Sequence, residues 1–215
     1  MKTPARNSII ISLTMLAILF ASAIAARMYY VNNAAPPHQI ISYKLNDYVS
    51  LREIDETSDI QIASKEYALF TIDEYQHRFG KIDESVLSQN QTCDTKILVL
   101  KMSALNKGPQ ENQTNLCLYS VQQDAWVNGV DLLLYMPLNK AKSANITLQP
   151  NEERTVLLPY SMYDFQFGFN DNWIHINENP FELVLKTYPN KVFIALGLPE
   201  PTSSFSSETI SVEAL

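Results

Sequence analysis

Apolar and polar positions alternate along short segments of the chain with the two-residue period of β-strands. Residues 60–70 and 95–105 are the longest of these segments, and the second is apolar on both alternate faces. That pattern is typical of a strand in the middle of a packed sheet. Shorter strands are predicted at residues 48–54, 116–121, 132–136, 154–160, 181–188 and 192–196. About eight strands at near-regular spacing indicate an all-β sandwich or barrel, and the last two strands are predicted to form a hairpin.

One short helix is predicted before the central strand. Thr71 and Glu74 have the spacing of a capping box, and Ile72, Tyr75 and Phe79 repeat with a helical period before Gly80. The helix is expected over residues 72–79, ended by the glycine in a left-handed conformation. Because so short a helix is unstable alone, it must pack on a sheet.

The N-terminus carries an export signal. Residues 9–26 are an uncharged run that follows Lys2 and Arg6. At 1.5 Å per residue the run spans about 27 Å, which matches the hydrocarbon core of a bilayer. Because a positive flank favours the cytoplasmic side, everything after Arg27 is expected outside the cytoplasm.

Cleavage of this segment is left open by Ala-x-Ala patterns that end near Ala25. The run is longer than the apolar part of a usual signal peptide, and Arg27, Tyr29 and Tyr30 are typical of a membrane interface. We therefore expect an uncleaved N-terminal transmembrane helix with an extracellular C-terminal domain. Secretion after cleavage near Ala25 is the alternative.

Four regions are predicted. Residues 1–26 form the signal or anchor helix, residues 27–42 form an extracellular spacer that contains a proline pair, and residues 43–198 form the sandwich. Residues 199–215, rich in Ser, Thr and Glu, are expected to be a disordered tail.

Charge narrows the classes of partner. The formal net charge is -7, and no cluster of lysine and arginine occurs in the sequence. Because nucleic-acid affinity depends on neutralising phosphates, this composition excludes DNA and RNA as expected partners. The same sign argument disfavours binding of the folded domain to anionic lipid, so contact with the membrane is expected through the N-terminal helix alone.

Three stretches together resemble a known family. Residues 95–107, residues 148–152 leading to Leu158-Pro159-Tyr160, and residues 183–191 are similar to signal-anchored surface proteins of unknown function from Gram-positive bacteria. The resemblance covers roughly residues 40–197 and implies a telokin-like immunoglobulin sandwich. Family members often have glycine where this chain has Asn151. The family brings no catalytic residues.

Cys93 and Cys117 are candidates for a disulfide in an extracytoplasmic setting. If the strands around Leu100 and Leu118 form a hairpin, the two cysteines lie on the order of 35 Å apart, out of bonding reach. If the second strand crosses to the other sheet, a bond can form. Two buried or half-buried thiols are the favoured alternative.

No catalytic residue, metal site or cofactor is expected. His38, His77 and His175 lack partners at metal-ligand spacing, and residues 170–172 and 177–179 are oxygen-rich but lack the spacing of a calcium loop. Ser161 has no flanking glycine and no recognisable triad order, and the five glycines are scattered singly. The chain is therefore expected not to be an enzyme.

A dense aromatic stretch is the candidate recognition surface. Its members lie within about 14 residues of an irregular segment. They are Tyr160, Tyr163, Phe165, Phe167, Phe169 and Trp173. The alternative is that these rings cover the core.

The leading functional hypothesis is an uncharacterised, membrane-tethered module that binds a protein or cell-envelope component without catalysis. An exported carrier of a small apolar ligand and an unrecognised hydrolase are the alternatives. The sequence identifies neither the ligand nor the oligomeric state.

Overall fold

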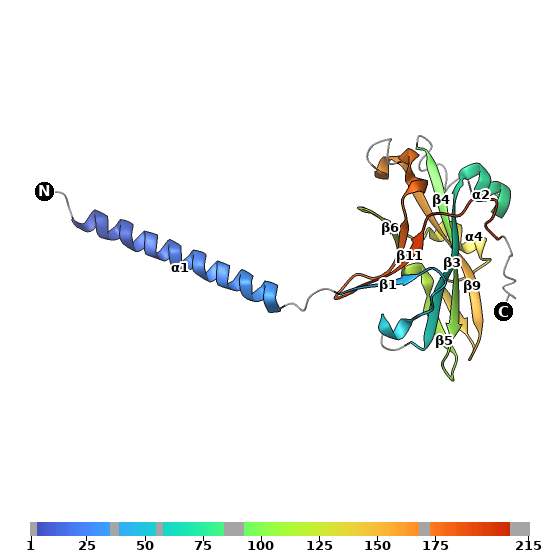
Figure 1. Ribbon diagram of the computed structural model, residues 1–215, viewed down its shortest axis with the longest axis horizontal. Helices are drawn as coiled ribbons and strands as arrows, with labels where there is room; N and C mark the ends of the chain where they lie inside the picture. Colours follow the sequence, from blue (N-terminus) through green and yellow to red (C-terminus); the bar gives the residue numbers. More distant parts are fainter. Residues whose placement is uncertain (1–3, 35–38, 55–57, 84–92, 168–172, 207–215) are drawn as a thin grey trace. The chain divides into compact units, whose positions relative to one another are not determined.

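The computed structural model describes residues 4–34, 39–54, 58–83, 93–167 and 173–206. The chain divides into two compact units, Met1–His38 and Gln39–Leu215. The first contains one helix, α1 (Pro4–Ala34), which Figure 1 shows in blue. The expected spacer at residues 27–42 is wrong at both ends, because the helix continues to Ala34 and a strand begins at Ile40.

Within the described residues, no helix is both long enough and apolar enough to cross a membrane.

Two main sheets build the second unit. The five-stranded sheet has the order β1-β11-β10-β6-β7, and the four-stranded sheet has the order β2-β3-β4-β9. The first sheet consists of β1 (Ile40–Lys44), β11 (Lys191–Gly197), β10 (Phe181–Lys186), β6 (Ser120–Gln123) and β7 (Trp126–Gly129). The second sheet consists of β2 (Val49–Ser50), β3 (Ile60–Thr71), β4 (Thr95–Asn106) and β9 (Glu153–Tyr163).

A third, two-stranded sheet pairs β5 (Asn112–Asn115) with β8 (Asn145–Leu148). All neighbours in the three sheets are antiparallel except β1 and β11, which run parallel. The predicted hairpin near the C-terminus is confirmed by β10 and β11. The predicted central strand is also confirmed, since β4 lies between β3 and β9.

The predicted helix is confirmed as α2 (Ile72–Phe79). The Thr71 side chain accepts from the Glu74 amide, and the Glu74 carboxylate accepts from the Thr71 amide at 2.8 Å. Gly80 ends the helix at φ 103 and ψ 172. The positive φ agrees with the prediction, but the extended ψ places this residue outside the left-handed helical region.

The strand predicted at residues 132–136 is wrong, because that segment is the helix α4 (Leu132–Leu138). Asp131 caps it, and its carboxylate accepts from the amides of Leu133 and Leu134. The run Leu-Leu-Leu-Tyr-Met-Pro-Leu has no alternation that would separate a strand from a buried helical turn. The sandwich therefore carries at least two short helices rather than the one expected.

Several short segments form 3-10 turns, and the first two of them replace parts of the strands predicted at residues 48–54 and 116–121. They are η1 (Leu51–Glu53), η3 (Leu116–Leu118), η4 (Asp164–Phe167) and η5 (Ile176–Glu178). Residues 48–54, predicted as one strand, keep only Val49 and Ser50 in a ladder.

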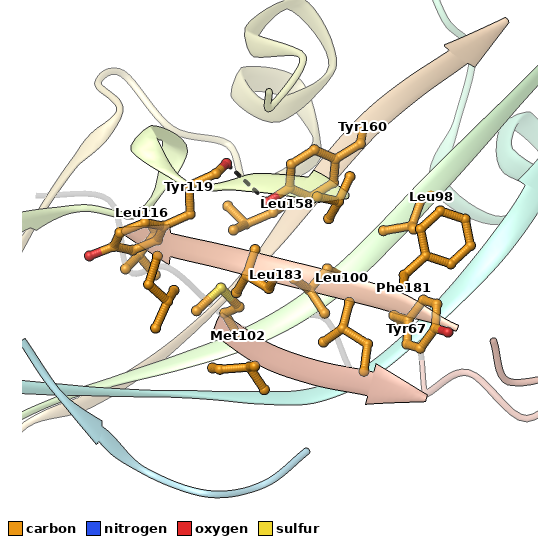
Figure 2. Close-up of a cluster of buried hydrophobic side chains, with 14 of the residues drawn as sticks. Tyr67, Leu98, Leu100, Met102, Leu116, Tyr119, Leu158, Tyr160, Phe181 and Leu183 are labelled. Atoms are coloured by element: carbon orange, nitrogen blue, oxygen red, sulfur yellow. Dashed lines mark hydrogen bonds between the residues drawn. The ribbon is translucent and has the colours of Figure 1, made fainter. Parts of the chain in front are cut away.

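The main core fills the space between the two sheets. Figure 2 shows Leu100 and Met102 of β4, Leu158 of β9 and Leu183 of β10 among its members. All four are fully buried. The β-sandwich part of the predicted fold is therefore confirmed, with strands of both sheets supplying large apolar side chains.

The outer face of the four-stranded sheet carries a second cluster. Phe70, Ile97 and Val99 pack there against Leu134 of α4 and against Phe205. Phe205 is 1% exposed, and its ring centroid lies 5.6 Å from that of Phe70.

The expectation of a disordered tail from Pro199 is therefore wrong for residues 199–206. The Glu200 amide donates to the Tyr67 carbonyl at 3.0 Å, and Arg78 Nη1 donates to the Thr202 carbonyl at 2.7 Å. The Ser- and Thr-rich composition predicts disorder, but buried Phe205 and the hydrogen bonds of Glu200 and Thr202 hold this segment against the sandwich. Residues 207–215 lie outside the described residues.

Asn106 explains why residues at the end of β4 and around residue 150 belong together. Its Nδ2 donates to the carbonyls of Gln110 and Leu148, and its Oδ1 accepts from the Gly108 amide. Asn151, at φ 62, donates its amide to the Asn106 carbonyl. A positive φ is where glycine fits most easily and asparagine next, so Asn151 suits the turn that the resemblance associates with glycine.

The immunoglobulin-like, telokin-like assignment stays a prediction. In an immunoglobulin domain the second and third strands lie in different sheets. Here β3 and β4 follow one another and pair within one sheet.

Candidate functional site

The six residues of the predicted recognition surface do not form one surface. Tyr160 is 0% exposed and Trp173 is 6% exposed, so both belong to the core, and this part of the prediction is wrong. The Tyr160 hydroxyl donates to the Tyr119 carbonyl at 3.4 Å, and burial raises the pKa of Tyr160 well above its ordinary value. Phe169 lies outside the described residues.

Phe167 lies between two tryptophans. Its ring stacks on Trp126 at 5.1 Å between centroids and lies 5.4 Å from Trp173. The Trp173 Nε1 donates to Asp94 Oδ2 at 2.7 Å, and Lys96 Nζ lies 4.8 Å from the Trp173 ring centroid. These contacts hold the three rings in place near the start of β4 and the end of β9.

Burial lowers the pKa of Lys96, while the nearby Asp94 charge opposes that shift. Sequence reasoning missed both residues. The sequence does show the two charges, which flank Thr95 at the start of the predicted central strand. A charged residue at a strand end is common, however, and without the partner ring it indicates nothing specific.

Tyr163 and Phe165 form what we call the exposed aromatic pair. Their rings stack at 5.6 Å between centroids with an interplanar angle of 9°; Phe165 is 60% exposed and Tyr163 is half-buried. Gln166 holds the turn, since its Oε1 accepts from the Tyr163 amide at 3.0 Å and from Trp126 Nε1 at 3.3 Å. Phe165 is therefore the accessible ring of the pair, on a backbone that hydrogen bonds hold in place.

Ser161 has the contacts of a structural residue. It is 7% exposed, and its hydroxyl donates to Asp131 Oδ2 at 2.6 Å. The other oxygen of that carboxylate caps α4. A nucleophilic serine needs a base that accepts its proton and is itself oriented for that task, whereas this carboxylate is engaged in holding a helix.

The two cysteines are both half-buried, and within the described chain no disulfide joins Cys93 to Cys117. The segment with Cys117 does cross to the other sheet, because β4 and β6 lie in different sheets. Burial raises the pKa of the Cys117 thiol to about 11, and the Tyr135 hydroxyl is its hydrogen-bonding partner. A protonated thiol is a weak nucleophile at neutral pH.

No group of three or more metal-ligating side chains occurs among the residues that the structure describes. His77 is exposed on α2, and His175 Nδ1 lies 2.7 Å from Glu178 Oε1. His38 and residues 170–172 lie outside the described part of the chain.

Comparisons with known proteins define a family. The model of a family described as a domain of unknown function, DUF5028, matches residues 40–192. No curated protein matches the chain. The host and the surface location that the sequence resemblance implied stay predictions.

Solved structures with a similar chain trace include other uncharacterised proteins. An uncharacterised β-sandwich protein from Clostridium difficile is 9% identical with a TM-score of 0.40, over 75% of this chain and 97% of its own. A functionally unknown protein from Listeria monocytogenes is 8% identical with a TM-score of 0.38, over 66% and 79%. A putative lipoprotein from Bacillus subtilis is 13% identical with a TM-score of 0.35, over 65% and 37%.

Proposed function

The chain belongs to the DUF5028 family, and we propose that it is a membrane-tethered β-sandwich module that binds a protein or another envelope component outside the cytoplasm, without catalysis. The observation that carries the proposal is the exposed aromatic pair of Tyr163 and Phe165 on a hydrogen-bonded turn.

Rigid exposed rings suit recognition. An aromatic side chain offers a large contact area and loses little rotational freedom when it is bound. Phe165 keeps 60% of its surface accessible although an apolar core lies directly behind the same turn. Burying the ring against a partner removes that surface from water, and aromatic residues often dominate such contacts.

The engaged polar groups support binding over catalysis. Ser161 and Asp131 satisfy one another, and the Cys117 thiol is protonated at neutral pH. The carrier and hydrolase alternatives stay predictions, with no contact in the described residues that favours either.

The tether rests on the sequence of the N-terminal unit. Lys2 and Arg6 precede an apolar run, and Arg27 follows it. This order favours a helix with its N-terminus in the cytoplasm and the domain outside.

A cross-linking comparison in cells of the source organism tests the binding proposal. Phe165→Ser is expected to reduce recovery of the cross-linked partner at least about tenfold, since a central aromatic contact contributes about 1.4 kcal/mol or more. Leu118→Ser is the matched control, because Leu118 is 77% exposed and lies outside the aromatic segment. Equal loss in both variants, or no specific partner with the unaltered chain, contradicts the proposal.

Membrane fractionation tests the tether separately. The full-length chain is expected in the membrane fraction after alkaline carbonate extraction. A chain shorter by about 25 residues, found in the medium, would instead identify the leader as a cleaved signal peptide.

A further inference from the structure

The edge strands of the two main sheets differ in how many of their outward backbone groups are hydrogen-bonded to the surrounding chain. An edge strand presents a row of backbone N–H and C=O groups that can pair with another strand. Both main sheets are open sheets, with β1 and β7 at the edges of one and β2 and β9 at the edges of the other.

The edge of β9 is closed by groups from the two ends of α4, Asp131 before the helix and Asn139 after it. Asn139 donates from Nδ2 to the Leu157 carbonyl at 2.7 Å, and its Oδ1 accepts from the Leu157 amide at 2.8 Å. The Asp131 amide donates to the Pro159 carbonyl at 2.8 Å, and proline has no N–H to satisfy at that position. These bonds replace a neighbouring strand.

The flanks of β7 and β3 make other contacts, a side-chain bond at β7 and backbone pairing at β3. Asn128 of β7 donates from Nδ2 to the Ser161 carbonyl, which links β7 to β9. Gln61 and Ile62 near the start of β3 pair with the two-residue strand β2, and Ala68 further along pairs with Glu200. A strand as short as β2 is a poor template for further pairing.

The outer edge of β1 pairs with no strand of the described chain. The Gln39 carbonyl accepts from the Lys191 amide, so residues 39, 41 and 43 direct their backbone groups toward β11. Ile40, Ser42 and Lys44 therefore direct theirs outward. The Lys44 amide and carbonyl are bonded to Asp47, which leaves the groups of Ile40 and Ser42 as the open part of the edge.

We propose that this edge pairs with β1 of a second copy of the chain, antiparallel and centred on Ile41. In that register Ile40 of each copy faces Ser42 of the other, and the two residues exchange N–H···O bonds. Four backbone hydrogen bonds form, and the contacts of Lys44 with Asp47 remain. The two five-stranded sheets then form one continuous sheet about a two-fold axis.

The side chains of β1 suit this pairing. Ile41 is half-buried against the core and faces its own copy across the axis, which brings two β-branched residues together. Ile40 is 71% exposed and lies beside the small Ser42 of the second copy. Lys44 lies beyond the paired residues, so no like charges oppose one another within the register.

A pair of substitutions at Ser42 tests the proposal with the full-length chain in detergent. Ser42→Pro removes an outward N–H and leaves the bonds between β1 and β11 in place. It is expected to raise the dimer Kd by at least about 30-fold, the loss of two backbone hydrogen bonds. Ser42→Ala keeps the amide and is expected to dimerise as the unaltered chain does. Sedimentation equilibrium measures both, and far-UV circular dichroism checks that each variant is folded.

Cross-linking in native membranes tests the register. Ile41→Cys places two cysteines at a non-hydrogen-bonded pair, about 4.5 Å apart at Cα, within the range of a disulfide. Oxidation is expected to give a disulfide-linked dimer. Ser203→Cys, exposed on the C-terminal segment, and the unaltered chain with its own two cysteines are the controls.

A monomer at every concentration overturns the proposal. So does a dimer that persists in Ser42→Pro, which would assign self-association to another surface, including α1. Cross-linking of Ser203→Cys as efficient as that of Ile41→Cys would show random collision rather than pairing of β1.

Discussion

The strands β9 and β1 both lie at the edge of a sheet, but in the described chain the outward backbone groups of β9 are hydrogen-bonded and most of those of β1 are not. Outward backbone groups of β9 are bonded to Asn128, Asp131 and Asn139. These three residues lie in one stretch of chain, from β7 to the residue after α4. At β1 only Asp47 caps the outer side, at the last residue of the strand. The difference shows that this chain can close an edge without adding a strand, provided that amide side chains are held at the right spacing.

Position along the chain accounts for much of the contrast. The β9 edge is closed by residues that α4 holds in place, and α4 itself is anchored by buried Leu134 and Tyr135. β1 is the first strand after the N-terminal unit, and no described segment follows it along its outer side. The closed edge therefore depends on residues that tertiary packing brings alongside β9, whereas no described residues are brought alongside the outer side of β1 in the same way.

Asn139→Ala is expected to have the largest effect, because it opens the closed edge of β9. It leaves the partly buried amide and carbonyl of Leu157 without partners, and each such group costs about 1 to 3 kcal/mol. We expect the free energy of unfolding to fall by about 3 kcal/mol, measured by urea denaturation with tryptophan fluorescence. Lys142→Ala, an exposed change three residues after Asn139, is the control and is expected within about 0.5 kcal/mol of the unaltered chain. A loss below 1 kcal/mol for Asn139→Ala would mean that water replaces the amide and that the edge is not closed in energetic terms.

Asp131→Ala tests whether the closure depends on the helix that carries it. The change removes the N-cap of α4 and the acceptor of the Ser161 hydroxyl, and keeps the backbone bond to Pro159. A cap contributes about 1 kcal/mol and an unpaired buried hydroxyl about 1 more, so a loss of about 2 kcal/mol is expected in the same assay. Ser161→Ala removes only the hydroxyl and should lose about half as much. If the two variants are equally stable, the cap does not hold the connection.

The smallest expected effect is a pH dependence at the first residue of β9. The Tyr48 hydroxyl donates to the Glu153 carboxylate and holds the pKa of Glu153 below its ordinary value of 4.5. Because the folded pKa is the lower one, this stabilisation is present above pH 4.5 and is lost as the pH falls through the folded value.

Tyr48→Phe is therefore expected to flatten the pH dependence of the urea midpoint on the acid side and to change stability little at neutral pH. Midpoints at pH 3, 4, 5 and 7 check this, with Tyr188→Phe as the exposed control. An unchanged acid slope in Tyr48→Phe would show that the hydrogen bond does not shift the titration.

The sequence predicted the long elements well because their signals are local. The capping box of Thr71 and Glu74 and the apolar residues on both faces of β4 are patterns of neighbouring residues only. The same approach was wrong for α4, where seven apolar residues carry no period and the deciding signal is the cap at Asp131. It was also wrong for Phe205, since one aromatic residue in a polar tail predicts nothing until the surface that receives it is known.

The candidate site divides in the same way. Aromatic density located the right segment, but burial separated Tyr160 and Trp173 from Phe165, and burial depends on which sheet lies behind each ring. Lys96 and Asp94 became part of the site only through Trp173, whose ring lies 77 residues further along the chain from the lysine.

By itself, the sequence of this protein determined the β-rich character, the helix α2 and the positions of the longest strands, because periodicity and capping act over a few residues. Tertiary structure alone decided which sheet each strand joins, which aromatic rings remain exposed and which edges are closed. Those outcomes depend on hydrogen bonds such as that of Asn139 with Leu157 and on contacts such as that of Phe205 with Phe70, between segments that only folding brings together. The open edge of β1 is the clearest example of what tertiary structure decides, since nothing in the sequence of Ile40–Lys44 distinguishes it from a strand paired on both sides.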